Sequence, residues 1–181
     1  ETLESYYRDR GFLKFSIESS QISLSRDKKS IFITYNINEG QKYTINDANV
    51  IGEIPFEEEI YIDIINNLKN QTYSQAQITG IEEFFVNVLG NRGYAFAEVS
   101  GDAEVINDTN EVKLTFSVVP GNKTYTRKIL FTGNNVTQDH VLRREMRQFE
   151  GAWTSDNSIE AGKVRLERLG YVKEVNVETV P

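Results

Sequence analysis

Three glycine–aromatic pairs recur along this chain about every 80 residues, and this internal repeat constrains the fold more than any other feature. The pairs are Gly11-Phe12, Gly93-Tyr94 and Gly170-Tyr171, at spacings of 82 and 77 residues. Turns that end in Gly40 and Gly121 form a second series with a similar spacing. Such a period is too long for a solenoid unit and suits a small domain. We therefore predict tandem copies of one small domain.

We place the copies at residues 1–40, 41–122 and 123–181. The first copy holds only the second half of the repeat, and the middle copy is complete. The last copy lacks its closing strand, so we expect the chain to be a fragment of a longer protein.

The middle copy predicts the anatomy of the repeat. A strand at residues 43–51 precedes two amphipathic helices. The first helix carries an apolar side chain at every fourth position, namely Phe56, Ile60, Ile64 and Leu68. The second begins after Ser74, with Gln77 at the spacing of a capping box. We expect Gly93 to end that helix with a positive φ, and Gly11 and Gly170 to do the same in their copies.

Two strands close the middle copy, at residues 95–106 and around residues 113–118. In the second of these strands Leu114, Phe116 and Val118 alternate with polar residues, which indicates one buried face and one solvated face. The predicted fold class is α+β: tandem β-α-α-β-β repeats, each a three-stranded mixed sheet with two helices on one face. In the last copy we expect strands at 125–132 and 171–179 and helices at 138–149 and 157–169.

Composition argues against an enzyme. Hydrophobic residues make up 39% of the chain, and no apolar run approaches the ~18 residues of a membrane-spanning helix. There is no Cys, and His140 is the single His. No Ser-His-Asp set and no glycine-rich phosphate loop can be assembled. We predict no catalytic residue, no metal site and no cofactor.

The net charge of −7 is unevenly distributed. Residues 1–122 carry 10 Lys/Arg and 19 Asp/Glu, a balance of −9, whereas residues 123–181 carry 10 and 8, a balance of +2. Nucleic-acid binding needs clustered cations, so the acidic body disfavours it. The basic end could face an acidic partner or lipid headgroups, or the imbalance could be ordinary uneven surface charge.

Two segments of the last copy resemble a known family. The stretch Val141–Trp153, with its Arg-Arg-Glu-Met and Glu-Gly-Ala-Trp runs, is similar to the barrel-proximal polypeptide-transport-associated (POTRA) domain of outer-membrane β-barrel assembly proteins. The stretch Arg165–Tyr171 fits the same domain, and Asp27-Lys28-Lys29 fits the third of five such domains. The resemblance covers essentially the whole chain: the rear half of the third domain, all of the fourth and most of the fifth.

The resemblance implies a non-enzymatic function on the periplasmic side of the Gram-negative outer membrane. Such a region guides unfolded outer-membrane protein precursors toward the membrane-embedded barrel of the same chain, binding them by strand addition to an exposed sheet edge. It also docks accessory lipoproteins. The expected contacts with a BamD-like lipoprotein are Arg143, Arg144, Arg147 and Glu150, and those with a BamB-like lipoprotein are Ile22 and Leu24.

Several alternatives remain open. The arginines could instead form a solvated helix face that pairs locally with Glu145 and Glu150. Trp153 is interpreted as a packing anchor rather than an interface residue. The chain could belong to a two-partner-secretion transporter or another barrel translocase, although its Arg-Arg-Glu-Met and Glu-Gly-Ala-Trp runs argue against this. A small α+β ligand-binding domain or hydrolase is the alternative from another class.

Overall fold

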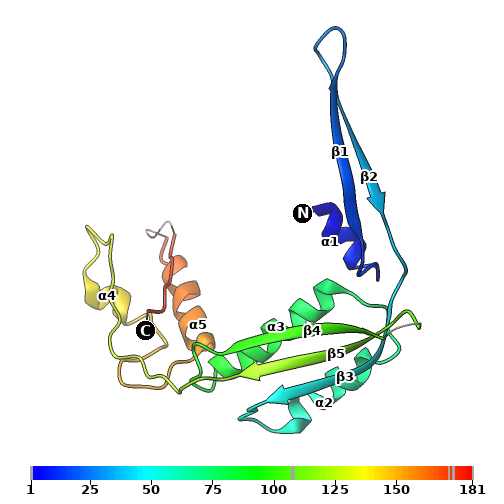
Figure 1. The fold of residues 1–181 in the computed structure, drawn as a ribbon. Helices are drawn as coiled ribbons and strands as arrows, with labels where there is room; N and C mark the ends of the chain where they lie inside the picture. The colour runs from blue at the N-terminus through cyan, green and yellow to red at the C-terminus, as the bar shows by residue number, and fades with distance from the viewer. Residues whose placement is uncertain (1, 107–108, 171, 173, 181) are drawn as a thin grey trace. The chain divides into compact units, whose positions relative to one another are not determined.

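The computed structural model describes residues 2–106, 109–170, 172 and 174–180 and has an α+β fold (Figure 1). The chain divides into two compact units. One comprises Glu1–Ile51, Phe56–Glu82 and Ser100–Ser117, and the other comprises Gly52–Pro55, Glu83–Val99 and Val118–Pro181.

The N-terminal elements are a short helix and a β-hairpin. Helix α1 (Thr2–Arg8) precedes strands β1 (Ser16–Leu24) and β2 (Ile31–Asn38), which pair in antiparallel fashion. The turn between the strands places Lys28 at a φ of 56°. Asp27 stabilises this turn by accepting hydrogen bonds from the Ser25 hydroxyl and, at 3.2 Å, from the Lys29 amide. These elements match the helix end and the two strands expected for the first copy.

The second sheet is a mixed sheet of three strands. Strands β3 (Thr44–Gly52), β4 (Glu98–Ile106) and β5 (Glu111–Val119) lie in the order β3-β5-β4, so β5 is central and the other two are edges. The predicted alternation in β5 is present: Leu114, Phe116 and Val118 are at most 1% exposed. One face of this strand is therefore covered by the core.

Two helical segments connect β3 to β4. The first is broken into a 3-10 turn, η1 (Glu58–Ile60), and helix α2 (Ile62–Leu68), with the chain bending at Tyr61. The predicted single helix is therefore wrong, because it is interrupted at Tyr61. Its apolar positions are nevertheless covered: Leu68 is buried and Phe56, Ile60 and Ile64 are half-buried, and Ile65 is buried as well.

Helix α3 (Gln75–Gly90) follows, and the Ser74 hydroxyl accepts a hydrogen bond from the Gln77 amide at 3.4 Å, in keeping with the predicted cap. The helix packs on β4, where a Cβ atom at Gly101 would lie 2.7 Å from the Ile78 side chain. The close approach of α3 to the sheet thus requires glycine at that position.

The repeated glycines adopt the expected positive φ, with values of 99° at Gly11, 97° at Gly93 and 56° at Gly170. At Gly93 the amide donates to the Gly90 carbonyl at 3.3 Å, and the next amide, of Tyr94, donates to the Leu89 carbonyl at 3.1 Å. This is the Schellman pattern, which satisfies the last carbonyls of α3 and requires a left-handed residue. The amides of Gly11 and Phe12 repeat the pattern at the end of α1.

The last part of the chain differs from expectation. It contains helices α4 (Asp139–Arg143) and α5 (Asp156–Glu167), and α4 is shorter than predicted because the amides of Glu145 and Met146 bond three residues back instead of four. The predicted strand at 125–132 is wrong, since only a single bridge between Tyr125 and Trp153 forms there. The described residues of 171–179 also form no strand.

These segments nevertheless enclose a small core. Leu142, Met146 and Leu166 are between 4% and 7% exposed. The half-buried residues packed against them are Ile129, Phe131, Leu169, Val172 and Val175. The two short helices are therefore held by apolar packing from irregular segments rather than by a sheet.

Candidate functional site

One face of the β1–β2 hairpin carries exposed apolar side chains. Ile22 pairs with Ile33 and Leu24 pairs with Ile31 across the two strands, so all four project on the same side. Their exposed fractions are 74% for Ile22, 54% for Ile33, 56% for Leu24 and 64% for Ile31. Tyr35 continues this face and is 51% exposed. A contiguous exposed apolar face of this kind is typical of a protein-contact surface.

Arg143 and Glu150 form a clamp on the backbone of Ile129. Arg143 Nη1 lies 2.8 Å from Glu150 Oε1, and its Nε lies 3.0 Å from Asp139 Oδ2. The Ile129 amide donates to Glu150 Oε1 at 2.8 Å, and the Ile129 carbonyl accepts from Arg143 Nη2 at 2.9 Å. Two side chains thus satisfy the Ile129 amide and carbonyl, as a neighbouring strand would.

The clamp changes the ionisation of its members. The Ile129 amide, followed by the Arg143 guanidinium, holds the pKa of Glu150 below its usual value. Hydrogen bonds to Asp139 and Glu150 raise the pKa of Arg143. The Arg143 and Glu150 side chains are 38% and 41% exposed, so they stay accessible to a partner while they make these contacts.

A second ion-pair network lies next to the clamp. Glu145 Oε2 lies 2.8 Å from Arg165 Nη2, and Glu145 Oε1 lies 3.2 Å from Arg144 Nε. The Arg165 hydrogen bond is the main reason that the pKa of Glu145 lies below its usual value. The Glu145 side chain is only 15% exposed, whereas that of Arg144 is 67% exposed. The local pairing considered for the arginines is therefore present for Arg143 and Arg144.

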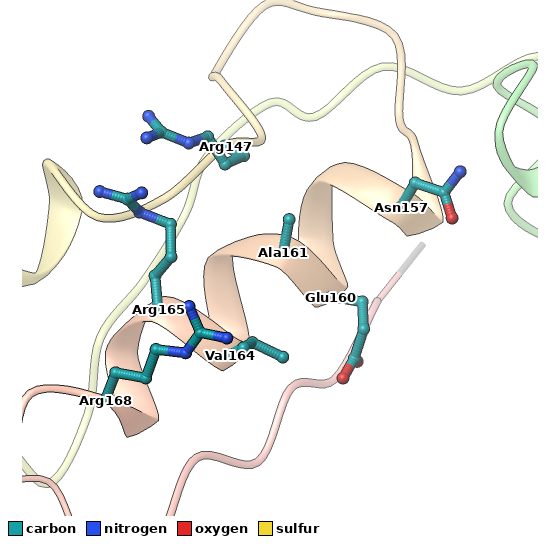
Figure 2. A pocket seen from close by; sticks show the side chains of 7 residues that line it. All are labelled: Arg147, Asn157, Glu160, Ala161, Val164, Arg165 and Arg168. Atoms are coloured by element: carbon teal, nitrogen blue, oxygen red, sulfur yellow. The ribbon is translucent and has the colours of Figure 1, made fainter.

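Arg147 has a different environment. It lines an open pocket of about 500 Å³ along α5, together with Arg165 and Arg168 (Figure 2). Asn157, Glu160, Ala161 and Val164 complete the lining. Of the four residues predicted for lipoprotein contact, Arg143 and Glu150 are joined directly, Arg144 belongs to the Glu145 network, and Arg147 belongs to the pocket.

Trp153 does not fit the interpretation as a packing anchor, because its side chain is 61% exposed. Its backbone forms the bridge with Tyr125, and a Cβ atom at Gly93 would lie 3.7 Å from the Trp153 Cβ. Lys123 Nζ lies 5.9 Å from the centre of the indole ring and 5.5 Å from that of Tyr94. The main chain of Trp153 is thus held in place while much of its ring faces solvent.

Arg165 and Arg168 were not predicted as site residues from the sequence. Their spacing of three places both side chains on one face of a helix, which is a signal that sequence can supply. Their meeting with Arg147 depends on tertiary structure. Among the described residues, no group of three or more His, Cys, Asp or Glu could hold a metal ion. In the same part of the chain, no helix combines the length and the hydropathy needed to cross a membrane.

A family model and two solved structures all relate this chain to POTRA domains. The POTRA family model, described as "Surface antigen variable number repeat", matches residues 1–40, 43–121 and 124–181. The chain is similar to a solved structure of Haemophilus influenzae BamA POTRA3-5, with 30% identity and a TM-score of 0.89, covering 97% of this chain and 69% of that one. It is also similar to the structure of Haemophilus ducreyi BamA lacking POTRA domains 1-3. This match has 36% sequence identity and a TM-score of 0.64, and it covers 74% of this chain and 25% of that one.

Two curated relatives are outer membrane protein assembly factors BamA. That of Buchnera aphidicola is 29% identical over 98% of this chain, and that of Neisseria meningitidis is 29% identical over 100% of it. The chain spans 29% and 23% of the lengths of these two relatives.

Proposed function

This chain belongs to the POTRA family, and we propose that it is the periplasmic part of a BamA-type factor that assembles outer-membrane proteins. The observation that carries this proposal is the match of one family model to three consecutive segments, together with similarity to BamA POTRA3-5 over 97% of the chain. The three matched segments support our proposal that domains meet near residues 40–43 and 121–125.

We assign two surfaces to accessory lipoproteins. The first is the Arg143–Glu150 clamp with Arg144 and Arg147, for a BamD-like partner. Its support is that Glu150 is 41% exposed although it is held in a fixed position by Ile129 and Arg143. A carboxylate that is already ordered loses little side-chain entropy when a partner cation binds to it. The second surface is the apolar hairpin face around Ile22 and Leu24, for a BamB-like partner.

We further propose that unfolded outer-membrane protein precursors bind by adding a strand at an edge of the three-stranded sheet. The strand order β3-β5-β4 leaves β4 at an edge, and β4 follows the second helix of the repeat. Strand addition uses main-chain hydrogen bonds and asks little of the guest sequence, which suits a factor with many substrates.

The docking proposal is tested at Glu150. Glu150→Lys places a cation where the partner is expected to present its own, so affinity for a purified BamD-like lipoprotein should fall at least tenfold in surface plasmon resonance. Because this change also breaks the clamp, Glu150→Gln is measured beside it. The amide oxygen still accepts from the Ile129 N–H, but the charge is gone. We expect weaker docking with an unchanged circular dichroism spectrum.

Glu167→Lys is the matched control, since Glu167 is an exposed residue at the end of α5. Docking should be unaffected by this change. Full affinity of both Glu150 variants would refute the assignment of Glu150, and a loss of fold in Glu150→Gln would show that its charge serves the clamp alone.

A further inference from the structure

Three arginines line the pocket along α5. Arg165 and Arg168 are three residues apart on the helix, and Arg147 reaches the same pocket from the segment that follows α4. In Figure 2 the side chains of Arg147 and Arg165 extend to the same side of α5, and the guanidinium group of Arg168 extends toward Val164. Between the arginines and Glu160, the floor is formed by Ala161 and Val164.

Most of this donor capacity is unused. Arg165 uses Nη2 for Glu145, at 2.8 Å, and its Nε is buried without a hydrogen-bond partner. Within the described part of the chain, the side chains of Arg147 and Arg168 form no hydrogen bond or ion pair. A guanidinium offers five N–H donors, so two complete groups face the pocket uncommitted.

The charges at this place do not balance. Glu145 is already shared between Arg144 and Arg165, so the carboxylate of Glu145 cannot also neutralise Arg147 and Arg168. Glu160 lies on the pocket lining but pairs with neither. Like charges held near one another repel unless a counter-charge is present. The pocket therefore favours an anion that is not part of its own wall.

We propose that this pocket binds a carboxylate side chain from an acidic segment of a partner protein. A planar carboxylate can accept two parallel hydrogen bonds from one guanidinium, and the methyl groups of Ala161 and Val164 suit the methylenes of an Asp or Glu side chain. Glu160, on the far side of the apolar floor, can accept a cation beside the bound carboxylate. The preferred segment therefore carries Glu or Asp followed by Lys or Arg.

This inference shares Arg147 with the BamD-like surface proposed above and rests on that proposal for this residue, but it adds Arg165 and Arg168 and concerns the opposite charge on the partner. It does not depend on a lipoprotein binding at Glu150. The test below uses peptides, so a failed lipoprotein experiment and a failed pocket experiment are distinguishable.

The experiment follows the arginine Nε–Hε signals of the ¹⁵N-labelled 181-residue chain by NMR. The probe is acetyl-Glu-Ala-Ala-Lys-amide, and the matched peptide has Gln in place of Glu. We expect saturable shifts at Arg147 and Arg168 with the first peptide and at least tenfold weaker binding with the second. Arg147→Gln/Arg168→Gln should weaken binding at least tenfold, whereas Arg26→Gln, an exposed change in the hairpin turn, should not.

Arg147→Lys/Arg168→Lys keeps both positive charges but removes the paired N–H donors of the guanidinium groups. This variant should therefore bind the Glu peptide severalfold more weakly than the unmodified chain. This variant also serves if the glutamine variant fails to fold. The proposal is overturned if the Gln peptide binds equally well or if no shift saturates. It is also overturned if inorganic phosphate or phosphatidylglycerol vesicles bind as tightly as the Glu peptide, because the site would then be a general anion or lipid site.

Discussion

At the scale of single residues, Gly90 is more constrained than its place at the end of a helix suggests. A Cβ atom at Gly90 would overlap the carboxylate of Asp156, which is half-buried beside it. Gly90→Ala therefore forces the Asp156 side chain to move, which should cancel the gain of about 0.5–1 kcal/mol that alanine otherwise brings to a helix. Urea denaturation followed by circular dichroism measures this change.

Gly80 in the same helix is the control, because nothing lies within 4 Å of a Cβ atom placed there. Gly80→Ala should raise the free energy of unfolding by about 0.5–1 kcal/mol through helix propensity. Equal effects of the two changes would contradict the packing argument at Gly90.

Glu150 gives a prediction about pH. Its pKa is lowered in the folded chain, so the stability that it contributes is present above its unfolded pKa and is lost as the pH falls through the folded value. Arg143→Gln should raise the pKa of Glu150 only part of the way to normal, because the Ile129 amide remains as the larger cause. A ¹³C NMR titration of the carboxylates checks this. Glu145 should not move, since its main partner is Arg165.

At the scale of elements, side chains on the exposed face of the β1–β2 hairpin can be changed with little effect on folding stability, so their effect on docking can be measured separately. Ile22 and Leu24 are 74% and 56% exposed, so Ile22→Asp/Leu24→Asp should change the free energy of unfolding by no more than about 0.5 kcal/mol per site. The same change places two charges in the proposed apolar interface, and affinity for a BamB-like lipoprotein should fall at least tenfold, measured by calorimetry.

Ser23→Asp is the control, because Ser23 lies between these residues and projects from the other face of the hairpin. Unchanged affinity of the double variant, or an equal loss with Ser23→Asp, would contradict the assignment of this face.

Elements that depend on local hydrogen bonds or on a periodic pattern of apolar residues were predictable from the sequence. The alternation of Leu114, Phe116 and Val118 identifies β5, and the repeated Gly11 and Gly93 mark helix ends because a left-handed residue is needed there. The division of the first helical segment into η1 and α2 was not predictable, because the bend at Tyr61 leaves no clear signal in the pattern of apolar residues.

The segment 125–132 was misread for a different reason. Its place in the repeat predicted a strand, but the Ile129 amide and carbonyl bond to the side chains of Glu150 and Arg143, which are more than ten residues away. The arginine pocket depends in the same way on tertiary structure, which brings Arg147 to Arg168. The family resemblance identified Arg147 as a partner-binding residue. The sequence could not show which arginines lack an ion-pair partner, because pairing depends on tertiary contacts.

At the scale of the whole molecule, the proposed domain boundaries predict independent folding. A fragment of residues 41–122 should unfold in one cooperative transition in urea. It should be less stable than the same residues in the full chain, because hydrogen bonds cross the boundaries. The Ala76 amide donates to Asp9 at 2.8 Å, and the Asn157 amide donates to Asn91 at 2.8 Å. A fragment that stays unfolded in native buffer would contradict these boundaries.

The clamp on Ile129 also makes one part of the backbone sensitive to the ionic medium. Ordinary strands are held by neutral main-chain bonds, but here an exposed ion pair supplies both the donor and the acceptor. Surface ion pairs weaken as dissolved salt screens them. The path of the chain around Ile129 is therefore set partly by ionic strength, whereas the central strand β5, buried on one face and paired on both sides, is indifferent to it.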